Sequence, residues 1–165
     1  MNADLDKIIN DAVSEVLSKK SDTADFRTVK HISLALARKL IYKVEEKAAE
    51  MGVKAVVAVS DASARLIAVE CMDDAYIASY DVAVNKTYTC ASLKMSTKQL
   101  STLAAPGASL YGIQFTNQGK IVIFGGGEVL KCGDTIVGAV GISGGSEEQD
   151  TALADYAKQV FENMI

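Results

Sequence analysis

His31 is the one histidine of this 165-residue sequence, and imidazole is the side chain most often used to ligate metals. A helix is predicted over residues 28–51, and at about 100° per residue its apolar stripe lies opposite His31. The residues on the side of His31 mix cationic, aromatic and small apolar groups: Arg27, Leu34, Ala35, Arg38 and Tyr42. We therefore expect the imidazole to face away from the core of its own subunit.

The surroundings predicted for His31 suit a flat, apolar ligand that carries two negative charges. Imidazole can bind iron, and guanidinium groups such as those of Arg27 and Arg38 can form charge-assisted hydrogen bonds with propionates. The hypothesis is a haem site in which His31 ligates the metal and four residues surround the ring: Arg27, Leu34, Arg38 and Tyr42. With one histidine per chain, a bis-histidine haem would be shared between two chains. The alternative is a solvated surface histidine.

Three further groups could carry chemistry, and each has a simpler structural interpretation. Asp61 and Asp73 are predicted near the ends of a hairpin, where turns commonly place aspartate. Lys86 lies within a predicted amphipathic helix and is interpreted as a lysine whose amine reaches the solvent, with a buried lysine as the alternative. The glycines within residues 124–130 do not match a phosphate-binding loop and predict a tight turn between strands.

Charge and composition narrow the classes of partner. The net charge is −4 and no basic stripe is present, which argues against a nucleic-acid surface. The apolar runs are short, which argues against a membrane span, and acids near the N-terminus argue against a secretory signal. A cytoplasmic protein is therefore expected. Cys71, Cys90 and Cys132 form neither a CxxC pair nor a zinc pattern, and are interpreted as reduced, mostly buried thiols.

The hydrophobic pattern predicts helices alternating with short strands. Helices are expected over residues 4–19, 28–51, 75–93, 96–104, and from a capping box at Ser146 and Gln149 to about residue 162. Strands are expected over 53–60, 65–72, 120–124, a short stretch ending at 131, and 135–143. Tight turns between successive strands imply antiparallel pairing. The expected fold class is α+β, with a five-stranded antiparallel sheet flanked by helices.

Two long segments resemble the GlcG/HbpS family. Residues 56–97 contain a strand that ends in aspartate, a hairpin, a Met-Asp-x-Ala step and a helix with lysine and small residues. Residues 119–130 and 133–150 are similar to the glycine-rich second half of the family, and the VGISGGSEEQD block is the most specific part. The likeness covers about residues 28–162 and is greatest to C-terminal domains of the PduO type.

The resemblance implies a five-stranded antiparallel sheet flanked by helices, assembly into a homo-oligomer, and haem binding, with cobalamin as a weaker candidate cofactor. It places His31 where PduO-type members carry an axial histidine on their first conserved helix. It also implies an association with cobalamin-dependent diol utilisation. The hairpin turn at 62–64 lacks the family's glycine pair, and Glu128 stands where the family has proline. These departures put a substrate site on those loops in doubt.

The N-terminal segment, residues 1–27, lies outside the resemblance and is predicted to be an amphipathic helix followed by a polar linker, with the family domain over 28–165. Helix 4–19 resembles the encapsulation peptides of bacterial microcompartment cargo, which implies a shell protein as partner and a location inside such a compartment. The alternative is that this helix docks on its own domain or across an oligomer.

Two functions other than haem binding stay open from the sequence. One is an enzyme that acts on a corrinoid or a glycolate-like acid and uses Asp61, Asp73 or Lys86 in a cleft. The other is a microcompartment assembly or cargo protein without a cofactor. Coordinates that bring the three side chains together would favour the enzyme.

Overall fold

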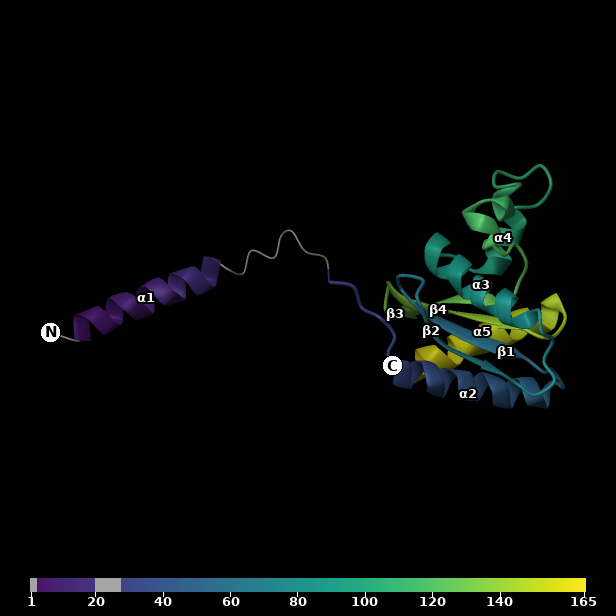
Figure 1. Cartoon of the computed structure of the whole chain (residues 1–165), viewed down its shortest axis with the longest axis horizontal. Helices are drawn as coiled ribbons and strands as arrows, with labels where there is room; N and C mark the ends of the chain where they lie inside the picture. The colour runs from purple at the N-terminus through teal and green to yellow at the C-terminus, as the bar shows by residue number, and fades with distance from the viewer. Residues whose placement is uncertain (1–2, 20–27) are drawn as a thin grey trace.

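The computed structural model describes residues 3–19 and 28–165. Its α-helices and strands are, in order, α1 (Ala3–Lys19), α2 (Leu34–Glu50), β1 (Val56–Asp61), β2 (Leu66–Cys71), α3 (Ser79–Leu93), α4 (Thr97–Leu103), β3 (Gly127–Cys132), β4 (Thr135–Ser143) and α5 (Glu147–Met164). All strand pairs in the sheet are antiparallel, and helices cover both faces (Figure 1). The predicted α+β class is confirmed.

The sheet has four strands in the order β2-β1-β4-β3, so the prediction of five strands was wrong. The missing strand is the segment 120–124. Its residues Ile121 and Val122 are buried, which accounts for the strand-like pattern. However, the backbone N–H of Val122 donates to Oγ1 of Thr89 on α3 at 3.0 Å rather than to a neighbouring strand. The segment therefore packs against a helix.

The central strand β1 is buried on both faces because helices lie above and below it (Figure 1). Val57 and Val59 join the large core formed with α2 and α5. Val56 and Ala58, which alternate with them, point to the other face and pack with Ala83 of α3. Beyond α3, helix α4 and the loop that follows it project away from the sheet (Figure 1).

Helix α2 begins at Leu34, six residues later than predicted. Ser33 is its N-cap and accepts a hydrogen bond from the N–H of Leu36 at 3.2 Å. Just before the cap, the N–H of Ile32 donates to the carbonyl of Val137 on β4 at 2.8 Å, so this backbone lies along the sheet. His31 therefore stands in the segment before α2, and its placement by helical periodicity was wrong.

The capping box predicted at the start of α5 is present. The Ser146 hydroxyl accepts from the N–H of Gln149 at 3.3 Å, and the Gln149 side chain accepts from the N–H of Ser146 at 3.0 Å. This reciprocal pair fixes where α5 begins, directly after the two glycines that follow β4.

Helix α1 stands apart from the sheet and its helices (Figure 1). Its apolar residues Ile8, Ile9 and Val13 are exposed. Among the described residues, no helix is long and apolar enough to cross a membrane. The predicted linker at 20–27 lies outside the described residues.

Candidate functional site

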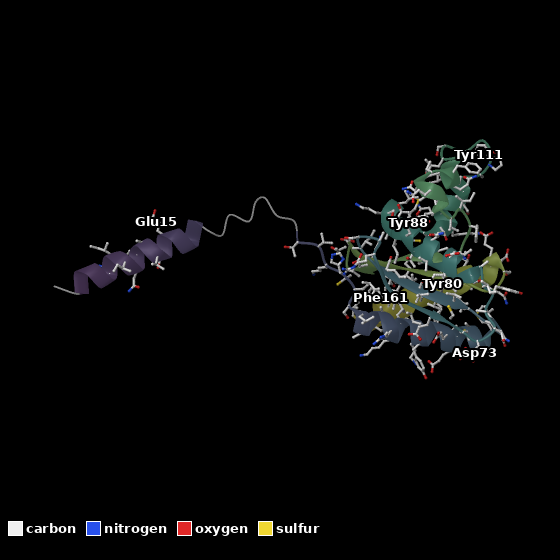
Figure 2. All side chains as sticks on the ribbon, in the orientation of Figure 1. Glu15, Asp73, Tyr80, Tyr88, Tyr111 and Phe161 are labelled. Carbon is white, nitrogen blue, oxygen red and sulfur yellow. The ribbon has the colours of Figure 1, made fainter. Side chains whose placement is uncertain are left out.

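His31 lies in a largely apolar hollow of about 350 Å³. The hollow is built from the segment before α2, the tip of the β3–β4 hairpin and the end of α5: its lining residues are Lys30, His31, Ile32, Ser33, Leu36, Cys132, Val137, Phe161 and Ile165. Figure 2 shows Phe161 beneath the sheet, near the start of α2. The His31 side chain is 38% exposed, so the imidazole is neither buried in the core nor fully solvated.

A buried carboxylate stands beside the ring. Nδ1 of His31 lies 3.7 Å from Oδ2 of Asp61, whose side chain is 3% exposed. Asp61 closes the β1–β2 turn, as its turn interpretation predicts, by accepting from the N–H groups of Ser63 at 2.8 Å and Arg65 at 3.0 Å. The same Oδ2 accepts a hydrogen bond from Nε of Arg65 at 3.2 Å, so the imidazole and a guanidinium lie beside one buried carboxylate.

Arg38 and Tyr42 line a second hollow, also of about 350 Å³, with Met164. Met164 is followed in sequence by Ile165, which lines the His31 hollow, so the end of α5 contributes one residue to each hollow. The predicted cluster is thus divided between the two hollows.

Two other predicted site residues are not found at either hollow in the described part of the chain. Leu34 is exposed and lines neither hollow. Arg27 lies outside the described residues. The cation that the structure does place in the His31 hollow is Lys30, which sequence reasoning missed although it is the neighbour of His31 in the chain.

Lys86 is fully buried, so its interpretation as a solvent-reaching lysine was wrong. Its Nζ donates to the carbonyl of Ile142 at 2.6 Å and to Oδ2 of Asp150 at 2.8 Å, and lies 5.0 Å from the centre of the Phe124 ring. Burial lowers the pKa of Lys86, and the negative charge of Asp150 opposes that shift. The pair joins α3, β4 and α5.

The three groups of the enzyme hypothesis do not share a cleft. Asp61 stands beside His31 at one end of β1. Asp73 lines a hollow of about 570 Å³ with Cys71 and Met72, at the far end of β2. Figure 2 places Asp73 and Phe161 at opposite ends of the domain. Because Lys86 is enclosed elsewhere in the core, this dispersal counts against the enzyme.

The cysteines differ from their interpretation as mostly buried thiols. Cys90 is buried, and burial raises the pKa of its thiol, whereas Cys71 and Cys132 are exposed. Within residues 3–19 and 28–165, no group of three or more His, Cys, Asp and Glu side chains could hold a metal ion.

Comparisons with known proteins agree with this fold. Residues 32–159 match a family model described as "haem degrading protein HbpS-like". An uncharacterised 15.0 kDa protein of Citrobacter freundii, from the dhaT-dhaS intergenic region, is 44% identical over 133 residues, which cover 81% of this chain and 94% of that protein.

Two further relatives belong to the PduO type. The corrinoid adenosyltransferase PduO of Salmonella typhimurium is 40% identical over 112 residues, 68% of this chain but only 33% of PduO. The crystal structure of a PduOC:heme complex has a TM-score of 0.75 and 36% identity, over 78% of this chain and 94% of that chain. The resemblance expected from the residue patterns is confirmed, and the chain belongs to the HbpS-like family.

Proposed function

We propose that this protein binds haem and that Nε2 of His31 is an axial ligand of the iron. The observation that carries the proposal is an imidazole in an apolar hollow, with a buried carboxylate 3.7 Å from its Nδ1. A carboxylate near the second ring nitrogen is a common neighbour of a metal-binding histidine, and a small movement of the ring would bring it within hydrogen-bond distance. The relative named as a PduOC:heme complex supports the same cofactor.

The residues of the hollow fit a tetrapyrrole. Leu36 and Ile165 offer apolar contact to a macrocycle, and Lys30 offers a cation to a propionate. Arg38 and Tyr42 line a separate hollow with Met164, and the guanidinium of Arg38 would offer a cation to a second propionate. Haem supplies an iron centre that binds small ligands or exchanges electrons, while the protein sets access and polarity around it.

The site is proposed to work in a homo-oligomer. A volume of about 350 Å³ is at the small end for ligand pockets, so a macrocycle would extend beyond the hollow onto a second surface. A second copy of the chain is the proposed surface. The domain also exposes large apolar side chains away from His31, with Ile77 97% and Phe115 83% exposed. Figure 2 shows Tyr111 at the tip of the projection that carries Phe115.

The proposed setting is cobalamin-dependent diol utilisation in the cytoplasm, with cobalamin as a weaker alternative ligand. The supporting observation is the 40% identity to part of PduO. The match covers only a third of PduO, so its adenosyltransferase activity is not part of the proposal.

Titration of the purified protein with hemin tests the proposed function. We expect a shifted Soret band on binding, and at least about tenfold weaker binding for His31→Ala, because a ligand to the metal is lost. Asp73→Ala, at the far end of the domain, is the matched control and should bind as the parent does. Light scattering on the same samples reports the oligomeric state. No Soret shift, or equal binding by His31→Ala, would contradict the proposal.

We further propose that α1 docks on a shell protein of a bacterial microcompartment. The supporting observation is an exposed apolar set, Ile8, Ile9 and Val13, on a helix that stands apart from the domain. Deleting residues 1–20 should abolish association with shells while leaving the unfolding of the domain unchanged. Co-purification with shells measures this, and a deletion variant that still co-purifies would rule out the role.

A further inference from the structure

A hollow of about 320 Å³ lies where the start of α3, the end of β4 and the start of α5 meet. We call it the Ser79 hollow, and the residues of its lining that carry the argument are Tyr76, Ser79, Phe124, Ser143, Glu147 and Asp150. Ser143 is the last residue of β4, whereas Val137, which lines the His31 hollow, lies near the start of that strand. The two hollows have no lining residue in common.

Two buried serine hydroxyls in this hollow leave one proton without an acceptor. Ser79 is 5% exposed and Ser143 is 8% exposed, and Oγ of Ser143 donates to Oγ of Ser79 at 3.0 Å. Two hydroxyls have two protons, and the hydrogen bond between them uses only one. Within the described part of the chain, the other proton has no acceptor at hydrogen-bond distance. A buried donor without an acceptor is unfavourable, so the pair calls for an oxygen atom of a bound molecule.

The two carboxylates that line the hollow are already paired with cations. Oδ2 of Asp150 accepts from Nζ of Lys86 at 2.8 Å, and Oε1 of Glu147 lies 3.7 Å from Nζ of Lys98. An anionic ligand would face both carboxylates, and a cationic one would meet two ammonium groups. The N–H of Gly145 donates to Oδ1 of Asp150 at 2.9 Å, so this backbone group is not open to an anion either. The charges therefore favour a neutral ligand.

The rest of the lining suits a molecule that has both O–H groups and C–H surface. The Glu147 carboxylate accepts from the N–H of Gly125 at 2.9 Å, and it can accept further hydrogen bonds because its two oxygens offer about four acceptor sites. The exposed rings of Phe124 and Tyr76 offer apolar surface on the same hollow. A hydroxyl group both donates and accepts, so the hydroxyls of one molecule can serve the serine pair and the carboxylate together.

We propose that the Ser79 hollow binds a neutral monosaccharide. Its hydroxyl groups accept from the pair of Ser79 and Ser143 and donate to Glu147, while the C–H face of the sugar ring packs on Phe124 and Tyr76. A volume of about 320 Å³ is at the small end for ligand pockets, so one sugar ring is expected rather than an oligosaccharide. This site goes beyond the proposed haem site and does not depend on it.

Ligand-observed saturation-transfer NMR on the full-length protein tests the proposal, with the methyl glycosides of glucose, galactose and xylose as probes. We expect saturation transfer to at least one of the three. Ser79→Ala and Ser143→Ala should each bind that sugar at least about tenfold more weakly, because a buried hydrogen-bond partner is lost. Methyl glucuronide, which has a carboxylate where methyl glucoside has a hydroxymethyl group, should bind at least about tenfold more weakly than methyl glucoside.

Ser63→Ala is the matched control for the loss of a serine hydroxyl. Ser63 is exposed in the β1–β2 turn, at the opposite end of β1 from Val56, which pairs with Ser143. Its replacement should leave sugar binding unchanged. Ala78→Trp is a second test variant, because Ala78 lines the hollow and is exposed, so a larger side chain blocks the space while both hydroxyls remain. Circular dichroism establishes that each variant is folded.

Each outcome decides for or against the monosaccharide. No saturation transfer to any of the three methyl glycosides overturns the proposal, and so does equal binding by Ser79→Ala, Ser143→Ala and Ser63→Ala. If the two hollow serine variants do not fold, Ala78→Trp decides, since binding equal to that of the parent would place the sugar elsewhere. Tighter binding of methyl glucuronide than of methyl glucoside would identify an anion site and contradict a neutral ligand.

Discussion

Replacing Asp150 with alanine should lower the free energy of unfolding by about 3–5 kcal/mol, because it leaves the ammonium of Lys86 buried without its counter-charge. Lys86 is 0% exposed, and the Asp150 carboxylate is its one charged hydrogen-bond partner among the described residues. The carboxylate also accepts from the N–H of Gly145 at 2.9 Å, so the substitution loses a second bond at the start of α5. Urea unfolding followed by circular dichroism measures the change.

A double-mutant cycle shows whether the loss comes from the unpaired charge. Lys86→Met alone leaves the Asp150 carboxylate buried without a counter-charge, whereas Lys86→Met combined with Asp150→Ala removes both charges. We expect the double variant to be more stable than the sum of the single effects predicts, by about 2 kcal/mol or more, since a buried pair is often replaced by apolar groups at small cost. Additive losses would mean that packing, and not charge, sets the cost of each change.

The same pair shows what sequence could and could not predict. Helical spacing placed Lys86 on a helix, as found, but said nothing of a partner 64 residues away in the chain. The depth of the lysine depends on Gly126 and Gly141, which leave the space that its side chain fills. The local sequence pattern therefore predicts that Lys86 lies on a helix, while long-range packing determines that its side chain is buried.

At the candidate site, too, the sequence predicted one part of the arrangement and long-range packing decided the rest. The identity of His31 as the candidate metal ligand followed from residue type alone, but its neighbours did not. Val29 and Ile32 fit a helical repeat, yet the hydrogen bond from Ile32 to Val137 draws this segment along the sheet. Cys132 and Phe161 enter the hollow from elements far along the chain. No spacing in the sequence predicts that these residues lie together, because their proximity depends on how the β3–β4 hairpin and α5 pack.

Gly141 is the position where one added methyl group should do the most damage to the domain. It lies on β4 where α3 crosses the sheet, and a Cβ there would lie 2.2 Å from the carbonyl oxygen of Ala83 and 2.8 Å from the N–H nitrogen of Thr87. Both obstacles are backbone atoms of α3, so no side chain can rotate away. Gly141→Ala should cost about 3 kcal/mol or more, at the upper end for overpacked cores.

Gly133→Ala separates this steric effect from the general cost of replacing glycine. Gly133 has a φ of +60° in the β3–β4 turn, and a Cβ added there would meet nothing within 4 Å, so alanine has only the conformational cost of about 1–2 kcal/mol. The stabilities of the two variants are compared by the midpoints of their urea unfolding curves, provided that both curves have the same dependence on urea concentration. A Gly141→Ala protein as stable as Gly133→Ala would show that α3 can lift from the sheet. Because Lys86 lies on that helix, such freedom would also weaken the case for a rigid buried ion pair.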